Sequence, residues 1–342
     1  MRILVIGGTG FSGPHVVRRL MKMGHEIALF HRGQTEADLP DGVQHILGDR
    51  EHLEYFTDEL KPFTPQIVLD MIPATEQHAQ GVMDVFTGVA QRVIAISSQD
   101  VYRAYGVLID IEPGPIEPIP LTEESPLRQK FYPYRERVDS SHHLYQYEKV
   151  LVERVFMSAP AFPGTILRYP MVYGPMDIQR RLSQYLKRMD DNRPAIVLEQ
   201  GMAAWRWTRG YVENIADAVV LTVTDERATG QIYNLGEEEA LSEAEWVKAI
   251  GVAAGWSGKV VIAHEDRVPR HLLPEINTAQ HFVVDTTRVR KELGYTEPVS
   301  IDEALRRTVT WERAHPPEDY DPKVFNYSAE DIFLAELEGH DS

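Results

Sequence analysis

The first thirteen residues of this chain combine a strand pattern, a glycine-rich turn and the start of a helix. The apolar run at residues 3–6 predicts a buried strand, and glycines follow at positions 7, 10 and 13. Beyond position 13 the apolar residues recur at helical spacing. A strand that passes through such a turn into a helix is a site for a dinucleotide pyrophosphate, because free N–H groups at the helix start face the anion.

Each glycine has a separate role in a turn of this kind. Gly7 permits the tight turn, Gly10 lets the backbone approach the phosphates, and Gly13 lets the helix pack on the strand. We expect the intervening Thr9 and Phe11 to contribute to the same cofactor site. The spacing G-x-x-G-x-x-G differs from the G-x-G-x-x-G of other dinucleotide folds, and an ordinary flexible turn is the alternative interpretation.

The first half of the chain alternates between strand and helix patterns. This alternation predicts an α/β protein with a Rossmann-type, doubly wound parallel sheet, in which ligands bind beyond the carboxyl ends of the strands. Strands are predicted at residues 2–6, 26–30, 43–47, 67–70, 92–97 and 164–168, and helices at 13–23, 51–61, 76–90 and 140–157.

The remainder of the chain is less regular. Residues 103–139 contain six prolines and no helical period, which predicts a long loop that is either a lid or an insertion. Residues 231–235 predict another strand, and Ser242 with Glu245 predicts a capping box for a helix over 242–255. We expect a cofactor domain from residues 1–175 plus 206–235, and a smaller, discontinuous substrate domain from 176–205 plus 236–342.

Composition excludes several classes of protein. The 342 residues are 43% hydrophobic and 25% charged, which is typical of a globular protein, and no run of 18 apolar residues is present that could cross a membrane. Cysteine is absent, which excludes disulfides and thiolate sites, and the 13 histidines are too dispersed to predict a metal site. A net charge of −17 disfavours nucleic-acid and membrane partners. We expect a cytoplasmic protein that binds a small molecule.

Tyr145 and Lys149 are four residues apart within the helix predicted at 140–157, so they would share one face. An ammonium beside a phenol lowers the pKa of the phenol, which suits it to proton transfer with a substrate hydroxyl. The spacing is common by chance, and a surface pair is the alternative. Ser98 directly follows the strand predicted at 92–97, so we expect it at the same edge of the sheet.

Together these motifs resemble the extended short-chain dehydrogenase/reductase family, the NAD(P)-dependent epimerases and dehydratases of sugars and related substrates. The resemblance covers nearly the whole chain, and its motifs are more specific for fold and cofactor class than for substrate. It rests on Gly7, Gly10 and Gly13, Gly48-Asp49, Ser98 with Val101 and Tyr102, Tyr145 with Lys149, residues 168–175, the region of Arg209, and a late helical segment at 285–294.

The resemblance implies catalytic roles for three residues. Tyr145 matches the acid/base, Lys149 the residue that binds the nicotinamide ribose and lowers the tyrosine pKa, and Ser98 the residue that hydrogen-bonds the reacting oxygen. These roles imply an oxidoreductase or epimerase that acts on a secondary alcohol or ketone of a sugar-like substrate. The resemblance also implies a homodimer in which the helix carrying Tyr145 lies at the interface.

Further positions match the cofactor contacts of the family. Asp49 matches the aspartate that contacts the adenine, and we expect the adjacent Arg50 at the cofactor as well. Pro170 and Met171 match the segment that touches the nicotinamide amide. In many sugar-nucleotide enzymes an asparagine occupies the place of Met171, and its absence here weakens the expectation of a nucleotide-linked substrate.

The end of the second predicted strand distinguishes the two nicotinamide cofactors. Enzymes that prefer NAD usually carry an acidic residue there, whereas this chain has His31 followed by Arg32. No carboxylate repels a 2′-phosphate and Arg32 can pair with one, so the sequence favours NADP. NAD remains the alternative if Arg32 instead stacks on the adenine or faces solvent.

The positions after Ser98 bear on the reaction. The dehydratase branch has an acid pair there, whereas this chain has Gln99 and Asp100, so simple dehydratase chemistry is not expected. Asp100 is either a lone acid or base, or an aspartate that forms the turn after the strand. We expect Gln99 and Tyr102 to lie near the substrate.

Arginines and tryptophans alternate at residues 205–209. Arg209 matches an arginine that grips a diphosphate in sugar-nucleotide enzymes, and Arg206 is a second candidate for binding an anion. Strand alternation would place Trp205, Trp207 and Arg209 on one face and Arg206 on the other. Such a face suits a sugar ring with an anionic group, and a half-buried strand with cation–π packing is the alternative.

Residues 29–35 and 47–50 also resemble a divergent branch of the superfamily that includes chloroplast RNA-binding proteins. This resemblance implies an alternative function, in which a catalytically divergent Rossmann module binds RNA or acts as a regulatory protein. The complete set Ser98, Tyr145 and Lys149 and the net charge of −17 both favour the enzyme.

Overall fold

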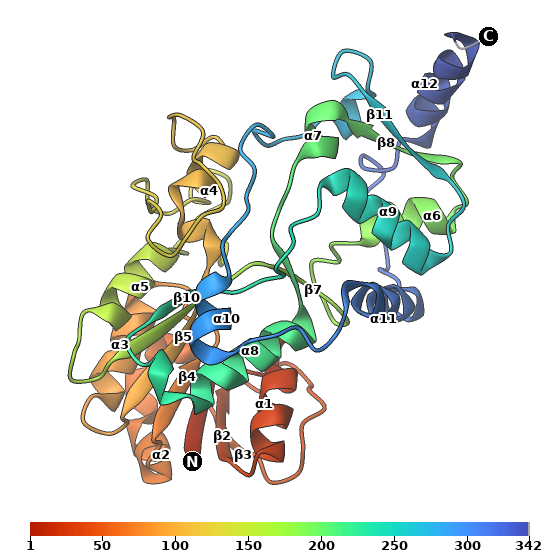
Figure 1. The fold of residues 1–342 in the computed structure, drawn as a ribbon. Coiled ribbons are helices and arrows are strands. Elements are labelled where there is room, and N and C mark those ends of the chain that lie inside the picture. Colours follow the sequence, from red (N-terminus) through yellow and green to blue (C-terminus); the bar gives the residue numbers. More distant parts are fainter. Residues whose placement is uncertain (341–342) are drawn as a thin grey trace.

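A seven-stranded parallel sheet forms the centre of the computed structural model, which describes residues 1–340 (Figure 1). The strand order is β10-β6-β5-β4-β1-β2-β3, and all neighbouring strands are parallel. The winding reverses beside β1, which is where doubly wound sheets bind their ligands. The strands are β1 (Arg2–Ile6), β2 (Glu26–His31), β3 (Gln44–Leu47), β4 (Ile67–Asp70), β5 (Arg92–Ser98), β6 (Gly164–Tyr169) and β10 (Ile232–Asn234). Each lies within about one residue of the predicted range, which confirms the predicted fold class.

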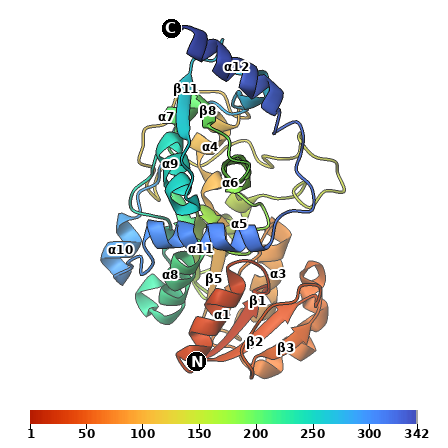
Figure 2. The same cartoon turned by 90° about the vertical axis from the view of Figure 1, so that its right-hand side faces the viewer.

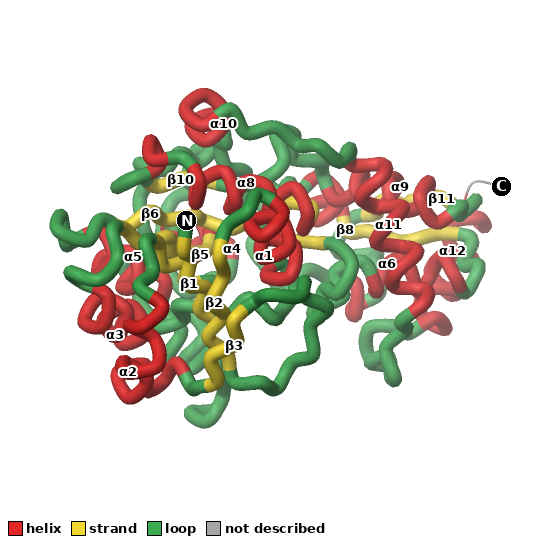
Figure 3. The backbone as a smooth tube through the Cα atoms, turned by 90° about the horizontal axis from the view of Figure 1, so that it is seen from below, coloured by secondary structure: helices red, strands yellow, loops and turns green. Residues whose placement is uncertain are grey.

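Helices cover both faces of this sheet (Figure 3). Helices α1 (Gly13–Lys22) and α8 (Val212–Thr224) lie on one face, and α3 (Glu76–Phe86) and α5 (Lys149–Met157) lie on the other. The strands β1, β2, β4 and β5 are buried over most of their lengths, because helices exclude water from both faces of the sheet there.

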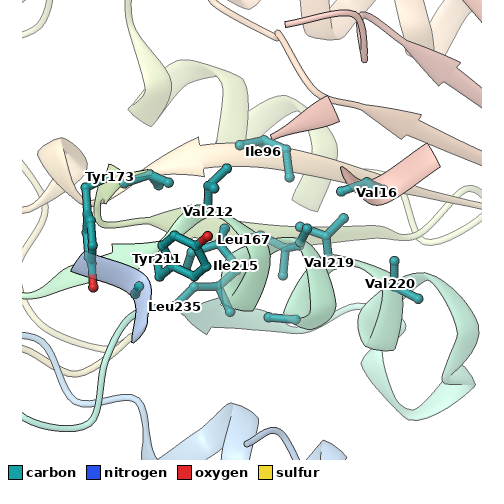
Figure 4. Packing of buried hydrophobic residues seen from close by; sticks show 14 of the residues in the cluster. Val16, Ile96, Leu167, Tyr173, Tyr211, Val212, Ile215, Val219, Val220 and Leu235 are labelled. Atoms are coloured by element: carbon teal, nitrogen blue, oxygen red, sulfur yellow. The ribbon is translucent and has the colours of Figure 1, made fainter. Parts of the chain in front are cut away.

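The packing beneath α8 shows how the sheet is held rigid (Figure 4). Val212, Ile215 and Val219 of α8 form one cluster with Leu167 of β6 and Ile96 of β5. All five side chains are buried, and each stabilises the fold by about 1.5–3 kcal/mol relative to an exposed position. This core supports the loops at the carboxyl edge of the sheet.

Elements from the second half of the chain extend from the sheet toward the end of the molecule opposite the N-terminus, whereas α10 packs on β10 of the sheet itself (Figures 1 and 2). Two parallel strand pairs lie outside the main sheet: β8 (Ala195–Glu199) with β11 (Lys259–Ala263), and β7 (Met171–Tyr173) with β9 (Arg209–Tyr211). The helices of this half besides α8 are α6 (Ser183–Asp190), α7 (Gln200–Ala204), α9 (Glu243–Ala254), α10 (Thr287–Leu293), α11 (Ile301–Ala314) and α12 (Tyr327–His340). Residues 341–342, the end of the predicted substrate domain, lie outside the described residues.

Helix α9 confirms a prediction made from two residues. The Ser242 side chain accepts a hydrogen bond from the Glu245 backbone N–H, and the Glu245 carboxylate accepts one from the Ser242 backbone N–H. This reciprocal pair is the predicted capping box, and it satisfies two N–H groups that the helix start would otherwise leave unpaired.

Two other segments differ from prediction. The helix expected at residues 51–61 is broken into a 3-10 segment at Arg50–Phe56 and a short α2 (Thr57–Leu60), because His52 leaves the helical region with φ of −132°. The loop expected at residues 103–139 begins with a helix, α4 (Arg103–Leu108). Within residues 1–340, no helix combines the length and apolar character needed to span a bilayer.

Candidate active site

A cavity of about 460 Å³ opens at the carboxyl edge of β1 and β2, in front of the glycine-rich turn. Gly7 and Gly8 have φ angles of 87° and 89°, a region that side chains rarely adopt. A Cβ atom on Gly10 would contact no protein atom, whereas a Cβ on Gly13 would overlap the backbone of Gly8. The turn is therefore closed behind Gly13 and open in front of Gly10, as a cradle for a ligand requires.

The turn also has the donors that a pyrophosphate needs. Across the described part of the chain, the backbone N–H groups of Thr9, Gly10 and Phe11 donate no hydrogen bond to protein. Thr9 lines the cavity, but the Phe11 side chain packs against the hydrophobic core and does not line it. Free N–H groups at the start of α1 bind an anion favourably, so these residues fit a dinucleotide pyrophosphate.

His31 and Arg32 line one end of the cavity, at the end of β2. The His31 Nε2 atom lies 2.9 Å from Nδ1 of His45, and the Gly33 N–H donates to His31 Nδ1 at 3.2 Å. Burial and the neighbouring His45 lower the pKa of His31, so its imidazole is neutral at pH 7. The Arg32 side chain is exposed and forms no ion pair with residues 1–340, which leaves its charge available to a ligand.

Asp49 and Arg50 also line this end of the cavity. The Asp49 carboxylate accepts a hydrogen bond from the Glu51 N–H at 3.1 Å and so caps the 3-10 segment that follows. Arg50 donates two hydrogen bonds to the buried carboxylate of Asp70, at 2.7 and 3.0 Å. The charge of Arg50 is therefore balanced within the protein, unlike that of Arg32.

Tyr147 also lines the cavity, together with His143 and Gln146, and its hydrogen bond to Asp100 places it beside the end of β5, on the other side of β1 from β2. Tyr145 does not line it: its backbone N–H donates to the His142 carbonyl at 2.9 Å, and it lies in a turn. Helix α5 begins only at Lys149, so the predictions of a helix from residue 140 and of a face shared by Tyr145 and Lys149 are wrong.

The late start of α5 has a clear physical cause. Glu148 is its N-cap, and the Glu148 carboxylate accepts a hydrogen bond from the Val150 N–H at 2.8 Å. The same carboxylate pairs with Arg128 at 3.1 Å and accepts from the Tyr132 N–H at 2.6 Å, and both charged side chains are fully buried. The ion pair with Arg128, 20 residues away in the sequence, thus holds Glu148 in the N-cap position, so the helix begins at Lys149.

Three predicted site residues lie together around Tyr147. The Tyr147 hydroxyl donates to Asp100 Oδ2 at 2.8 Å, and Lys149 Nζ lies 5.7 Å from the centre of the Tyr147 ring. The Ser98 hydroxyl accepts from the Asp100 backbone N–H at 3.2 Å. Lys149 donates to the carbonyls of Pro73 and Ile96, both at 2.8 Å. The structure therefore places Ser98, Asp100 and Lys149 next to Tyr147 rather than Tyr145.

Burial dominates the electrostatics of this group. It raises the pKa of the Asp100 carboxyl, and the nearby Arg128 guanidinium opposes that effect. Burial and the Asp100 carboxylate raise the pKa of the Tyr147 phenol well above its ordinary value. Burial lowers the pKa of Lys149 to about 8. The phenol is therefore a neutral hydrogen-bond donor at pH 7, with a carboxylate as its acceptor.

Gln99 and Tyr102, which we expected near the substrate, face the interior. The Gln99 side chain donates to the Leu235 carbonyl at 2.7 Å. The Tyr102 hydroxyl donates to Asn234 at 2.6 Å and accepts from Arg168 at 2.9 Å, and the residue has no exposed surface. Both residues tie the end of β5 to β10 and β6, so the structure does not offer their side chains to a ligand.

The arginines at 206 and 209 differ in availability. Arg209 is 2% exposed, forms a buried ion pair with Glu243 and stacks 4.4 Å from the ring centre of Trp246. Arg206 is half-exposed and lies 3.5 Å from Glu245. The structure differs from the expectation for Arg209, because its guanidinium is buried and paired with a carboxylate of the protein rather than exposed to a ligand. The cation–π interpretation holds for Arg209, with Trp246 as its partner.

The remaining predicted cofactor residues lie outside the cavity. Pro170 and Met171 connect β6 to β7, where Met171 pairs with Arg209 in the strand ladder, and neither lines the cavity. Sequence reasoning also missed Tyr147 and Asp70. The only signal for Tyr147 was a second tyrosine two residues before Lys149, and Asp70 ends a predicted strand, where ligand-site residues gather.

Comparison with known proteins agrees with the fold. The model of the NAD dependent epimerase/dehydratase family matches residues 3–236. The chain is 21% identical over 321 residues to the chloroplast stem-loop binding protein of 41 kDa b from Arabidopsis thaliana, covering 89% of this chain and 77% of that protein. It is 23% identical to the UDP-N-acetyl-alpha-D-glucosaminuronate decarboxylase of Bacillus cytotoxicus, covering 91% and 98%.

Solved structures extend the comparison to three dimensions. The UDP-glucose 4-epimerase of Thermotoga maritima, determined with UDP-glucose, superposes with a TM-score of 0.68 at 19% identity, covering 92% of this chain and 99% of that one. At this level of identity the likeness concerns the fold. The family match, by contrast, spans the glycine turn, Asp100 and the start of α5, and more than half of the sequence. The chain therefore belongs to the NAD-dependent epimerase/dehydratase family, the enzymes of the extended short-chain dehydrogenase/reductase type.

Proposed function

We propose that this protein is an NAD(P)-dependent oxidoreductase or epimerase that acts on a secondary alcohol or ketone of a sugar-like substrate. The observation that carries this proposal is a single cavity whose lining includes both the open glycine turn and the half-buried Tyr147. The dinucleotide supplies or accepts hydride when bound. The protein supplies the anion-binding turn, a phenol for proton transfer, and Ser98 as a hydrogen-bonding group for the reacting oxygen.

The two ends of the cavity would hold the two halves of the cofactor. Thr9 and Gly10 would bind the pyrophosphate, and Asp49 would contact the adenine. Arg32 supports NADP as the preferred form, because its guanidinium is exposed, forms no ion pair within residues 1–340 and follows a position 31 that lacks a carboxylate. Lys149 would bind the nicotinamide ribose after releasing one of its two backbone carbonyl partners.

A phenol is the acid/base group in this proposal, and two tyrosines compete for the role. Tyr145 has the spacing to Lys149 that the family pattern implies, whereas Tyr147 lines the cavity.

The relatives support a sugar-linked substrate. Their names include a UDP-N-acetyl-alpha-D-glucosaminuronate decarboxylase, a 2′-dehydrokanamycin reductase and a dTDP-glucose 4,6-dehydratase. Met171 and the internal pairing of Arg209 argue against a tightly held nucleotide diphosphate, which leaves Arg206 as the residue for an anionic group. We also propose that the chain has two domains, residues 1–175 plus 206–235 and residues 176–205 plus 236–342, and that the substrate binds between them. We propose further that the protein forms a homodimer.

The proposal is tested by titrating the protein with NADPH and with NADH and following the fluorescence of the reduced nicotinamide. Gly10→Ala should weaken both by tenfold or more (about 1.4 kcal/mol), because its Cβ would meet only the ligand. Gly81→Ala on α3 is the matched control, since its Cβ makes only an ordinary contact with Leu53 and lies away from the cavity. Binding of neither cofactor, or equal affinity of both glycine variants, would refute the proposal.

Arg32→Ala separates the two cofactors in the same assay. Loss of a charge-assisted contact should weaken NADPH by about 10- to 100-fold, corresponding to about 1.5–3 kcal/mol, and leave NADH nearly unchanged. Equal effects on both would refute the NADP preference. Mass spectrometry of the protein as purified would identify any retained cofactor, and light scattering would measure the predicted dimer.

RNA binding is the second candidate, supported by the similarity to the Arabidopsis thaliana stem-loop binding protein. The net charge of −17 opposes it, because RNA binding depends on neutralising phosphates with basic residues. A salt-sensitive gel shift of a stem-loop RNA, combined with no NADPH or NADH binding, would favour this function over the enzyme.

A further inference from the structure

Tyr147 lines the cavity at the glycine turn and hydrogen-bonds to a buried carboxylate. Tyr147 lines the same cavity as Gly7 and Gly10, and its hydroxyl donates to Asp100 Oδ2 at 2.8 Å. Within the described residues, Tyr145 forms no side-chain hydrogen bond of this kind. Its carbonyl accepts from Arg135 at 3.4 Å, and its ring lies 5.1 Å from the Arg135 guanidinium, outside the cavity.

The Asp100 carboxylate has an oxygen that is free to accept a proton or a hydrogen bond within residues 1–340. It is 6% exposed, and its second oxygen, Oδ1, has no hydrogen-bond partner within residues 1–340 although it is buried. Its Oδ2 atom also lies 3.4 Å from the Tyr134 hydroxyl, which in turn is 2.9 Å from the Tyr105 hydroxyl. A buried carboxylate with an unsatisfied oxygen is costly, and gaining a proton relieves that cost.

Nearby charges do not lock Asp100 in its ionised form. The Arg128 Nε donates to the Asp100 backbone carbonyl, not to the Asp100 carboxylate. The other N–H groups of Arg128 donate to the Glu148 carboxylate and to the Lys130 carbonyl. Lys149 directs its ammonium to two backbone carbonyls. The ionisable groups around the carboxylate are Tyr105 on α4, Arg128 and Tyr134 in the following loop, and Tyr147, Glu148 and Lys149 at the start of α5.

We propose that Tyr147, rather than Tyr145, exchanges the proton with the substrate, and that it does so as a relay to Asp100. This inference rests on the proposed function. When the substrate alcohol is oxidised, its O–H proton moves to Tyr147 Oη as the phenolic proton moves to Asp100 Oδ2. The electron pair of the substrate C–H bond leaves as hydride to the oxidised dinucleotide. The products are the ketone, the reduced dinucleotide and a neutral Asp100 carboxyl, and reduction of a ketone reverses each transfer.

This relay differs physically from a phenol activated by lysine alone. A lysine-activated phenol must ionise before it accepts a proton, and the contact with Asp100 opposes that ionisation. In the relay the phenol is never ionised, because it loses one proton as it gains another. Asp100 then determines the pH dependence: oxidation requires its carboxylate, and reduction requires its carboxyl.

The first test needs no substrate. The full chain is labelled with tyrosine carrying ¹³C at Cζ, and the phenol resonances are followed against pH by NMR, with Tyr147→Phe and Tyr145→Phe identifying their own signals. Asp100→Asn should lower the pKa of Tyr147 by at least about one unit, because it removes the carboxylate charge and its hydrogen bond, and should leave Tyr145 unchanged. An unchanged Tyr147 titration in Asp100→Asn would overturn the relay.

The second test uses NADP⁺ as the probe in the same samples. Its binding should shift the Tyr147 resonance and not that of Tyr145, whereas a shift of Tyr145 instead would overturn the assignment. If NADP⁺ does not bind, the proposed function fails, but the Asp100→Asn titration still decides whether the two side chains are coupled. The two failures are therefore distinguishable.

Kinetics add a third measurement, with any compound among UDP-glucose, dTDP-glucose and 2′-dehydrokanamycin that the wild type converts. Tyr147→Phe and Asp100→Asn should lower the rate at least about 100-fold, and Tyr145→Phe less than about threefold. Asp100→Asn should also abolish the limb of the pH–rate profile that belongs to Asp100. A large loss in Tyr145→Phe with an active Tyr147→Phe would overturn the assignment.

Discussion

Removing the charge of Glu243 tests whether Arg209 is part of the framework or a binding group. Arg209 and Glu243 are 2% and 4% exposed, and Glu243 also accepts a hydrogen bond from the Tyr185 hydroxyl at 2.6 Å. Glu243→Gln keeps the shape of the side chain but leaves the guanidinium without a counter-charge in a site that water does not reach. If Arg209 is held for a ligand instead, the protein should tolerate this change.

The expected cost follows from that burial. Breaking a buried ion pair by removing one charge destabilises a protein by about 3–5 kcal/mol, because the remaining charge stays desolvated. The matched control is Asp190→Asn, which removes an ion pair with Arg313 whose side chains are 37% and 43% exposed. That change should cost about 0–1 kcal/mol, since water solvates both groups when the pair is broken.

Urea unfolding at pH 7 measures both free energies, with an unchanged denaturant slope showing that the two-state comparison is valid. Adding Arg209→Gln to Glu243→Gln should recover part of the loss, with a coupling of about 2–3 kcal/mol, because the orphaned charge is then removed. A cost below about 1 kcal/mol for Glu243→Gln would refute the reasoning. If UDP-glucose stabilised Glu243→Gln but not the wild type, Arg209 would be accessible to a diphosphate.

Two further predictions concern the turn and the buried lysine. Gly13→Ala should destabilise the fold by about 1–3 kcal/mol in thermal unfolding, because its Cβ would overlap the backbone of Gly8, and a cost equal to that of Gly81→Ala would contradict this packing. The pKa of Lys149 is about 8 in the folded protein, against an ordinary value of 10.5, so between these pH values the unfolded chain binds more protons and the contribution of this group to stability rises with pH. Wild type should gain about 3 kcal/mol relative to Lys149→Met between pH 7 and pH 10.5 in urea unfolding, and parallel curves for the two proteins would contradict the shifted pKa.

The positions of the strands were predictable because they depend on local patterns. The strands Ile67–Asp70 and Arg92–Ser98 each contain a short apolar run, at residues 67–69 and 93–96, of a length typical of a buried strand. The capping box at Ser242 is equally local, since its two partners are three residues apart. Helix α5 was predicted nine residues too long because its start depends on Arg128, which no pattern near residue 148 reveals.

The amino-acid sequence by itself determined the doubly wound sheet, the glycine turn before α1 and the family, because these follow from periodicity and from residues close together in the chain. The folded protein decided which side chains meet at the site. Asp100 and Tyr147 are 47 residues apart, and Arg209 and Glu243 are 34 apart, so their contacts arise only when separate elements pack. Packing turned Arg209 inward to a carboxylate and directed Tyr147 to the cavity. The chemistry available to this chain therefore depends on tertiary contacts that a sequence motif can suggest but cannot specify.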